Sequence, residues 1–202
     1  MHYNTSFIKM EYYFFNKLLN FAKQIRNFVT FETVDNDNFI VYIRNDIKKR
    51  DDFMNKADKA KELFEGGCNC CQAVFCAFLD ENKMSKEDAL RLSAGFGGGF
   101  GRLREVCGAV SGMTMVLSEN FASSDPNDHE KKAALYKLIQ EAAGKFKEEN
   151  GSIICRELLG LSENETSHVP EKRTNEYYKK RPCAELVHCA AAIAEKYLEE
   201  SR

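Results

Sequence analysis

Eight cysteines are the residues of this 202-residue chain best able to do chemistry. They occupy positions 68, 70, 71, 76, 107, 155, 183 and 189. The thiolate form of cysteine attacks disulfides, binds soft metals and is readily oxidised. Because nothing resembling an export signal opens the chain, we expect a cytoplasmic protein with reduced thiols. Metal binding or thiol redox chemistry is therefore favoured over a disulfide scaffold.

Four of these cysteines are expected in the first turns of four separate helices. Cys70, Cys155 and Cys183 each come within three residues of an expected capping residue or proline. Cys107 opens the helix that follows the glycine-rich loop. Unpaired N–H groups and the macrodipole stabilise a thiolate there, and can lower its pKa from about 8.5 toward 7. Arg102 and Arg104 are expected to act on Cys107 in the same direction. We predict that the four thiols are catalytic, or that they bind a metal ion or an iron–sulfur cluster.

The other four cysteines are expected to matter less. Cys76 and Cys189 lie on or beside apolar helix faces, where a free cysteine usually packs as a small apolar residue. Cys68 and Cys71 flank Cys70 and are candidates for auxiliary ligands or resolving thiols.

The cysteine spacing excludes several familiar sites. One Cys-x-x-Cys spacing is present, Cys68-Asn-Cys-Cys71, but no second one accompanies it as a zinc ribbon requires and no His follows it as in c-type haem attachment. Its helical surroundings also lack the βαβ pattern of a thioredoxin motif. The four candidate cysteines are separated by 37, 48 and 28 residues. Any site that they share must therefore be assembled by the tertiary fold, as in bundles whose ligands project from facing helices.

The glycine-rich segment 95–101 is expected to be a turn that presents Cys107. It contains Gly-x-Gly spacings but follows a helix-like segment and lacks the Gly-Lys-Ser/Thr ending of a phosphate-binding loop. If the backbone contacts a cofactor, we expect it at Gly98, Gly99, Gly108 and Gly112. The histidines show no ligand pairing and are expected to be surface or packing residues; they are His2, His129, His168 and His188.

Helical periodicity and capping residues predict an all-α fold, a compact bundle of about six helices. Asp125-Pro126 is expected to start a long helix, and Ser152 to cap a short one. Gly108 and Gly112 predict a central helix that its neighbours approach closely. The segments expected to be helical are 55–65, 70–81, 85–94, 107–118, 126–150, 152–159 and 182–200, with a loop containing a helical turn at 163–180.

Residues 1–53 differ in composition from residues 54–202. They contain no Cys, Gly or Pro, yet hold 12 of the 23 aromatic residues. One interpretation is that the native start is Met54 and that 1–53 is upstream sequence read through in frame. The alternative is a genuine small element, with a helix at 11–28 and a strand at 38–43 that has no second strand pattern to pair with.

Charge and hydropathy argue against two classes of partner. The balance of 29 basic against 31 acidic residues, a net charge of −2, is atypical of nucleic-acid binders. No apolar run approaches the roughly 18 residues that membrane insertion requires.

The segment Cys107-Gly-Ala-Val-Ser-Gly112 resembles the Cys-Gly-Ala-x-x-Gly motif of the family of candidate redox proteins named C_GCAxxG_C_C. Cys70, Cys155 and Cys183 match the other three of its four characteristic cysteines, and 97–99 matches its glycine run. The resemblance covers about residues 55–200, and the family length of about 140 residues fits a start at Met54. It implies a redox protein but no particular reaction.

These observations leave several functions open. The four thiols either cycle between dithiol and disulfide, or hold a metal ion or iron–sulfur cluster that carries electrons. The alternatives are a non-catalytic metal-binding module, structural or trafficking, and an interaction domain whose cysteines merely pack. The redox partner is unknown, and a homodimer is one option for a bundle of this size.

Overall fold

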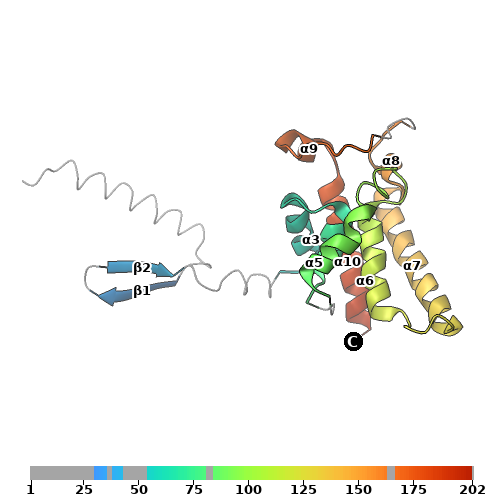
Figure 1. Cartoon of the computed structure of the whole chain (residues 1–202), viewed down its shortest axis with the longest axis horizontal. Helices are drawn as coiled ribbons and strands as arrows, with labels where there is room; N and C mark the ends of the chain where they lie inside the picture. The colour runs from blue at the N-terminus through green and yellow to red at the C-terminus, as the bar shows by residue number, and fades with distance from the viewer. Residues whose placement is uncertain (1–29, 36–37, 43–53, 81–83, 163–166, 202) are drawn as a thin grey trace, which may run out of the picture. The chain divides into compact units, whose positions relative to one another are not determined.

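The computed structural model describes residues 30–35, 38–42, 54–80, 84–162 and 167–201 (Figure 1). Its internal contacts divide the chain into two units, Met1–Phe53 and Met54–Arg202. The boundary coincides with the change in composition, while a native start at Met54 stays a prediction.

The first unit contains a β-hairpin. Strand β1 (Thr30–Asp35) pairs antiparallel with β2 (Asn38–Tyr42). The strand expected at 38–43 is therefore present, but the expectation that it has no partner was wrong. The period-two signal that would have revealed β1 is weak, because its apolar residues Phe31 and Val34 do not alternate with polar ones. The helix expected at 11–28 lies outside the described residues.

The described residues of the second unit are all helical or irregular, which confirms the all-α prediction. Besides the 3₁₀ turn η1 (Ala94–Phe96), the α-helices are α3 (Lys56–Glu65), α4 (Cys70–Ala77), α5 (Lys86–Ser93), α6 (Gly108–Phe121), α7 (His129–Asn150), α8 (Cys155–Leu158), α9 (Asn175–Lys180) and α10 (Cys183–Glu200). Helices α6, α7 and α10 lie against one another along the bundle (Figure 1). Among the described residues, none of these helices has the length and apolar character needed to cross a membrane.

Side-chain caps fix two of the helix starts. The side-chain oxygen of Asn69 accepts hydrogen bonds from the backbone N–H groups of Cys71 and Gln72, both at 3.0 Å. The Gln72 side chain accepts one from the Asn69 N–H at 2.9 Å, which completes a capping box. Ser85 caps α5 through the Asp88 N–H at 3.1 Å.

Two predicted helix starts were wrong. Helix α7 begins with Asp128 as its cap, because Asp125 instead accepts a hydrogen bond from the Asn127 N–H at 2.9 Å and forms a turn. Helix α8 begins only at Cys155, because Ser152 accepts from the Ile154 N–H at 2.9 Å and holds the preceding turn. Helix α4 also ends at Ala77, before the expected residue 81.

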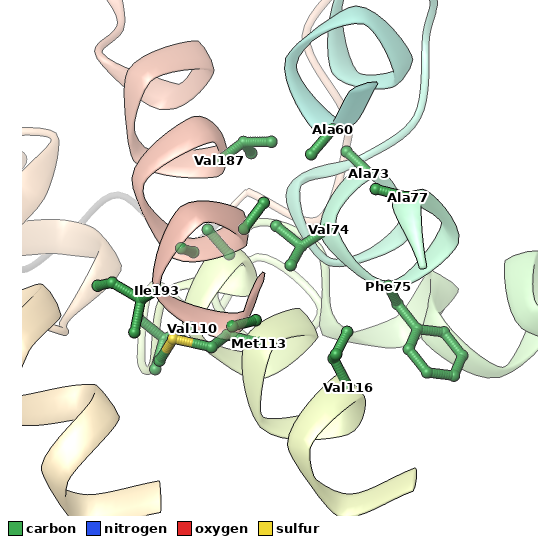
Figure 2. Packing of buried hydrophobic residues seen from close by; sticks show 14 of the residues in the cluster. Ala60, Ala73, Val74, Phe75, Ala77, Val110, Met113, Val116, Val187 and Ile193 are labelled. Carbon is green, nitrogen blue, oxygen red and sulfur yellow. The ribbon is translucent and has the colours of Figure 1, made fainter. Parts of the chain in front are cut away.

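The core lies where α3, α4, α6 and α10 meet, as Figure 2 shows. Val74, Met113 and Val187 are fully buried in it. The alanines Ala60 and Ala73 are also buried, and residues this small let helix axes approach closely. A tightly packed bundle of this kind can hold residues from distant parts of the chain in fixed positions at its ends.

Candidate functional site

The structure brings the four predicted cysteines together at one end of the bundle. Three are the first residues of their helices and one is an N-cap: Cys70 begins α4, Cys155 begins α8, Cys183 begins α10, and Cys107 caps α6. The negative charge of a Cys70 thiolate raises the pKa of each of the other three, so the thiols are close enough to interact electrostatically. In Figure 1 this is the end that carries α8 and α9.

Backbone pairing joins the two segments that carry Cys107 and Cys155. Val106 and Ile154 form an isolated antiparallel bridge. The Cys107 N–H donates to the Ile153 carbonyl at 2.8 Å, and the Cys155 N–H donates to the Glu105 carbonyl at 2.6 Å. Two cysteines 48 residues apart in the sequence are thus held by main-chain hydrogen bonds.

Two glycines of α6 allow Cys70 to lie close to the N-terminus of that helix. A Cβ at Gly108 would lie 3.1 Å from the Cβ of Cys70, and a Cβ at Gly112 would lie 2.8 Å from both the Val74 Cβ and the Cys71 carbonyl oxygen. The predicted close approach at these glycines is confirmed, with α4 as the neighbour. The Cys-Gly-Ala-x-x-Gly segment therefore places Cys107 at the N-cap position of α6. Its two glycines lack the side chains that would hold Cys70 away from α6.

The glycine-rich loop forms a left-handed turn. Five consecutive residues from Gly98 to Arg102 have φ between 60° and 73°, and Arg104 has φ 65°. The Phe100 N–H donates to the Phe96 carbonyl at 3.3 Å within this turn. A left-handed conformation costs a non-glycine residue about 1–2 kcal/mol, and such strain concentrates at functional sites. Here the turn directs Arg102 and Arg104 toward the cysteines.

A pocket of about 280 Å³ opens onto the cysteine cluster. Cys70, Cys155 and Cys183 line it, whereas Cys107 lies behind them and is 4% exposed. Four arginines, a tyrosine and a histidine also line it, namely Arg102, Arg104, Arg173, Arg181, Tyr177 and His168. Arg102 and Arg104 follow the glycine-rich loop, but no motif surrounds the other two arginines or the tyrosine. Arg173 and Tyr177 lie in the segment 163–180 that is predicted to be a polar loop with a helical turn, and Arg181 directly follows it.

Cys70 is the thiol most ready to react. A hydrogen bond from the Cys183 thiol lowers the pKa of Cys70 to about 7, outweighing burial, which acts in the opposite direction. The charge of Arg173 and the backbone N–H groups of Gly98 and Cys70 itself add to this stabilisation. The same hydrogen bond, together with burial, raises the pKa of Cys183.

The prediction that all four thiolates are stabilised was correct only for Cys70. Burial raises the pKa of Cys107 to about 12, and the nearby Cys70 thiolate adds to the rise. Burial also raises the pKa of Cys155, although a hydrogen bond and the charge of Arg104 oppose it. Arg104 was expected to lower the pKa of Cys107, but the thiol whose pKa it lowers is that of Cys155. Where a thiol is deeply buried, the rise in pKa caused by removal from water is larger than the fall caused by a helix N-terminus.

The remaining cysteines lie outside the pocket lining. Cys76 packs in the core as expected, and burial raises its pKa to about 11. Cys189 is half-buried, donates to Glu149 Oε2 at 3.2 Å and accepts from Asn150 Nδ2 at 3.2 Å. Cys71 is fully buried and its thiol contacts Met115 Sδ at 3.5 Å. Auxiliary roles for Cys71 and for Cys68 stay predictions.

Of the glycines expected to contact a cofactor, Gly98 lines the pocket. A Cβ at Gly99 would lie 2.6 Å from the Cβ of Cys155, so packing accounts for this glycine as it does for the two on α6. Backbone contact with a cofactor stays a prediction. His188 lies apart, with Nε2 3.3 Å from Asp58 Oδ1, and His2 is outside the described residues.

Within the described part of the chain, no group of three or more His, Cys, Asp or Glu side chains is arranged to hold a metal ion. The cluster can nevertheless supply sulfur ligands, since soft thiolates are the groups that zinc and iron–sulfur clusters prefer. As arranged, its most evident chemical property is one activated thiol hydrogen-bonded to another.

Comparison with known proteins gives one match. The model of a family described as "Putative redox-active protein (C_GCAxxG_C_C)" matches residues 68–197. No curated protein and no solved structure matches the chain. The matched range contains the four clustered cysteines, the glycine-rich loop and every residue that lines the pocket.

Proposed function

This chain belongs to the C_GCAxxG_C_C family of redox-active proteins, and on that premise we propose that Cys70 and Cys183 cycle between dithiol and disulfide. The observation that carries the proposal is the position of the two thiols: Cys70 and Cys183 are the first residues of α4 and α10 and line the same pocket, and their interaction lowers the pKa of Cys70. A lowered pKa increases the share of the thiolate, which is the form that attacks a disulfide.

The reaction follows the usual course of thiol–disulfide exchange. The Cys70 thiolate attacks one sulfur of a substrate disulfide, forms a mixed disulfide and expels the other sulfur as a thiolate. The Cys183 thiol gives its proton to that leaving thiolate and attacks the Cys70 sulfur. A Cys70–Cys183 disulfide forms, and the second half of the substrate leaves as a thiolate, which takes a proton from water. Starting from the Cys70 thiolate, the protein gives up two electrons and one proton; the second proton is the one that Cys70 released to solvent on ionising, so one disulfide is reduced to two thiols.

The electrostatics of the pair support this order of events. While Cys70 is a thiolate, its hydrogen bond and charge hold the proton on Cys183. Once Cys70 is in a mixed disulfide, that negative charge is gone and Cys183 becomes easier to deprotonate. The attacking thiol is thus activated first, and the resolving thiol is activated by the first step.

A second pair is supported by the segments that carry Cys107 and Cys155. The backbone pairing of 105–107 with 153–155 joins these segments, and the charge on Cys70 raises the pKa of both thiols. We propose that they accept oxidising equivalents from the Cys70–Cys183 disulfide by a second exchange within the cluster.

A metal-binding module is the second candidate function. The observation that favours it is the convergence of four cysteines from four elements, a donor set typical of zinc or of an iron–sulfur cluster. In that case Cys70, Cys107, Cys155 and Cys183 would be the ligands, and the metal would be structural, trafficked or electron-carrying.

Peptide mapping after mild oxidation tests the proposal. The reduced protein is treated with diamide, and we expect a Cys70–Cys183 link, followed by a second link only at higher oxidant. In Cys183→Ser, a small disulfide should leave a persistent adduct on Cys70. Cys189→Ser is the matched control and should behave as the parent protein, since Cys189 is outside the pocket lining. Equal oxidation rates in the parent and in Cys70→Ser, with both folded, would refute the proposal.

A further inference from the structure

The pocket over the reactive thiol carries a strong excess of positive charge. Four arginines line it, and among the described residues that do so Glu171 supplies the one carboxylate. Arg181 pairs with Glu171, and Arg102 Nη2 lies 3.8 Å from it. A single carboxylate shared between two arginines leaves most of the cationic charge in the pocket without a counterion from the chain.

Arg104 is the residue of the pocket that points most directly to an anionic ligand. It is 4% exposed and lines the pocket, yet its buried Nε finds no hydrogen-bond partner among the described residues. Its contact on the protein side is the Cys155 thiol. A buried guanidinium N–H without an acceptor is costly, and a buried arginine is normally matched to an anion.

The backbone keeps these cations close together at a cost in strain. Arg102 and Arg104 both have positive φ, 69° and 65°, so each is held in a conformation that disfavours side-chain-bearing residues. Burial and the neighbouring Arg104 lower the pKa of Arg102, as expected where like charges are crowded. The repulsion between these two cations would be reduced by an anion bound between them.

We propose that the pocket binds a small disulfide that carries carboxylate groups, and that this is the substrate of the thiol pair; the inference rests on the proposed function. The planar guanidinium of Arg104 offers paired donors for a carboxylate, and Arg102 extends the cationic wall toward solvent. With its carboxylate held there, the ligand's sulfurs lie over Cys70 and Cys183, which line the same pocket. A volume of about 280 Å³ suits a small molecule.

The other three arginines have protein partners and complete the wall. Arg102 Nε donates to the Ser167 carbonyl at 2.8 Å, and Arg181 pairs with Glu171. Arg173 donates to the carbonyls of Phe64 at 2.8 Å and Cys68 at 2.7 Å, and its charge contributes to the potential at Cys70. The direct contact with the ligand's carboxylate is therefore expected at Arg104, while Arg102 adds to the positive potential of the pocket.

Three disulfides of similar length and different charge test the proposal with the full chain. They are 3,3′-dithiodipropionate, which is dianionic, bis(2-hydroxyethyl) disulfide, which is neutral, and cystamine, which is dicationic. Rates of adduct formation on Cys183→Ser are measured by intact mass and divided by the rates with free 2-mercaptoethanol. We expect the dianion to react at least tenfold faster than the neutral disulfide and the preference to shrink in high salt. A preference for the neutral or cationic disulfide would overturn the proposal while leaving the dithiol function intact.

Charge variants locate the preference in the pocket. Arg102→Gln should reduce the preference for the dianion severalfold, whereas Glu171→Gln should increase it. Arg91→Gln is the matched control, because Arg91 is an exposed arginine of α5 that pairs with Asp88 outside the pocket. A drop of equal size in Arg91→Gln and Arg102→Gln would show a general charge effect and overturn the assignment.

An unreactive dicarboxylate separates a failure of this proposal from a failure of the proposed function. Suberate has the length of 3,3′-dithiodipropionate but no sulfur, and its binding to Cys70→Ser is measured by calorimetry. Binding there, together with exchange in the parent, supports both proposals. Binding without any exchange overturns the thiol function and the substrate with it, and leaves an anion site. Exchange without binding overturns the anion preference alone.

Discussion

Replacing Gly112 by alanine tests how the cysteine cluster is assembled. In the middle of a helix this change would ordinarily stabilise the protein by about 1 kcal/mol. Here the new Cβ would lie 2.8 Å from the Cys71 carbonyl oxygen and from the Val74 Cβ, whereas ordinary contacts begin at 3.4 Å. Helix α4 must therefore move away from α6 by about half an ångström.

The size of the effect follows from two opposing contributions. Overpacking of a tight core costs about 1–3 kcal/mol, which outweighs or cancels the gain in helix propensity. We expect Gly112→Ala to be less stable than the parent by about 0–2 kcal/mol. Gly144 is the matched control, since it lies within α7 and a Cβ there would meet nothing within 4 Å. Gly144→Ala should gain up to about 1 kcal/mol.

Urea unfolding of the two reduced variants, followed by far-UV circular dichroism, measures the difference directly. Helix propensity affects both in the same way, so the gap between them, about 1–3 kcal/mol, reports the contact with α4. If Gly112→Ala gains as much stability as Gly144→Ala, the close approach does not exist, and the account of how Cys70 reaches Cys107 is wrong.

Four further predictions follow from the site and the chain. Cys183→Ala removes the hydrogen bond that lowers the pKa of Cys70, so the pH midpoint of its alkylation by iodoacetamide should rise above about 7; an unchanged midpoint would contradict this. Gly99→Ala and Gly160→Ala are both strained by positive φ, 73° and 61°, but a Cβ meets neighbours only at Gly99. The free energy of unfolding should therefore fall by about 1–3 kcal/mol more in Gly99→Ala than in Gly160→Ala. Anaerobic purification with absorption spectroscopy and elemental analysis should give a colourless protein with substoichiometric metal; iron with acid-labile sulfide, or stoichiometric zinc, would favour the metal-binding alternative. Mass spectrometry of the natural protein should find peptides starting at Met54, and abundant peptides from 1–53 would refute that start.

Many of the helix starts can be predicted from the local sequence. The capping box at Asn69 and Gln72 and the cap at Ser85 act over three or four residues, so their consequences can be read without a structure. Prediction failed where two local structures compete for the same side chain. Asp125 and Ser152 both have capping character, but each forms a turn before its helix begins.

The sequence by itself predicted which four cysteines the fold brings together, because each was expected at a helix N-terminus and matches a characteristic cysteine of the family. It could not determine which thiol is activated. That depends on burial and on a hydrogen bond between Cys70 and Cys183, which are 113 residues apart. The cationic pocket likewise exists only in the folded chain, since Arg104 and Arg181 meet there from separate segments. Helix caps are local interactions, whereas desolvation and charge at a site are sums over everything packed around it, and only the tertiary structure fixes those neighbours.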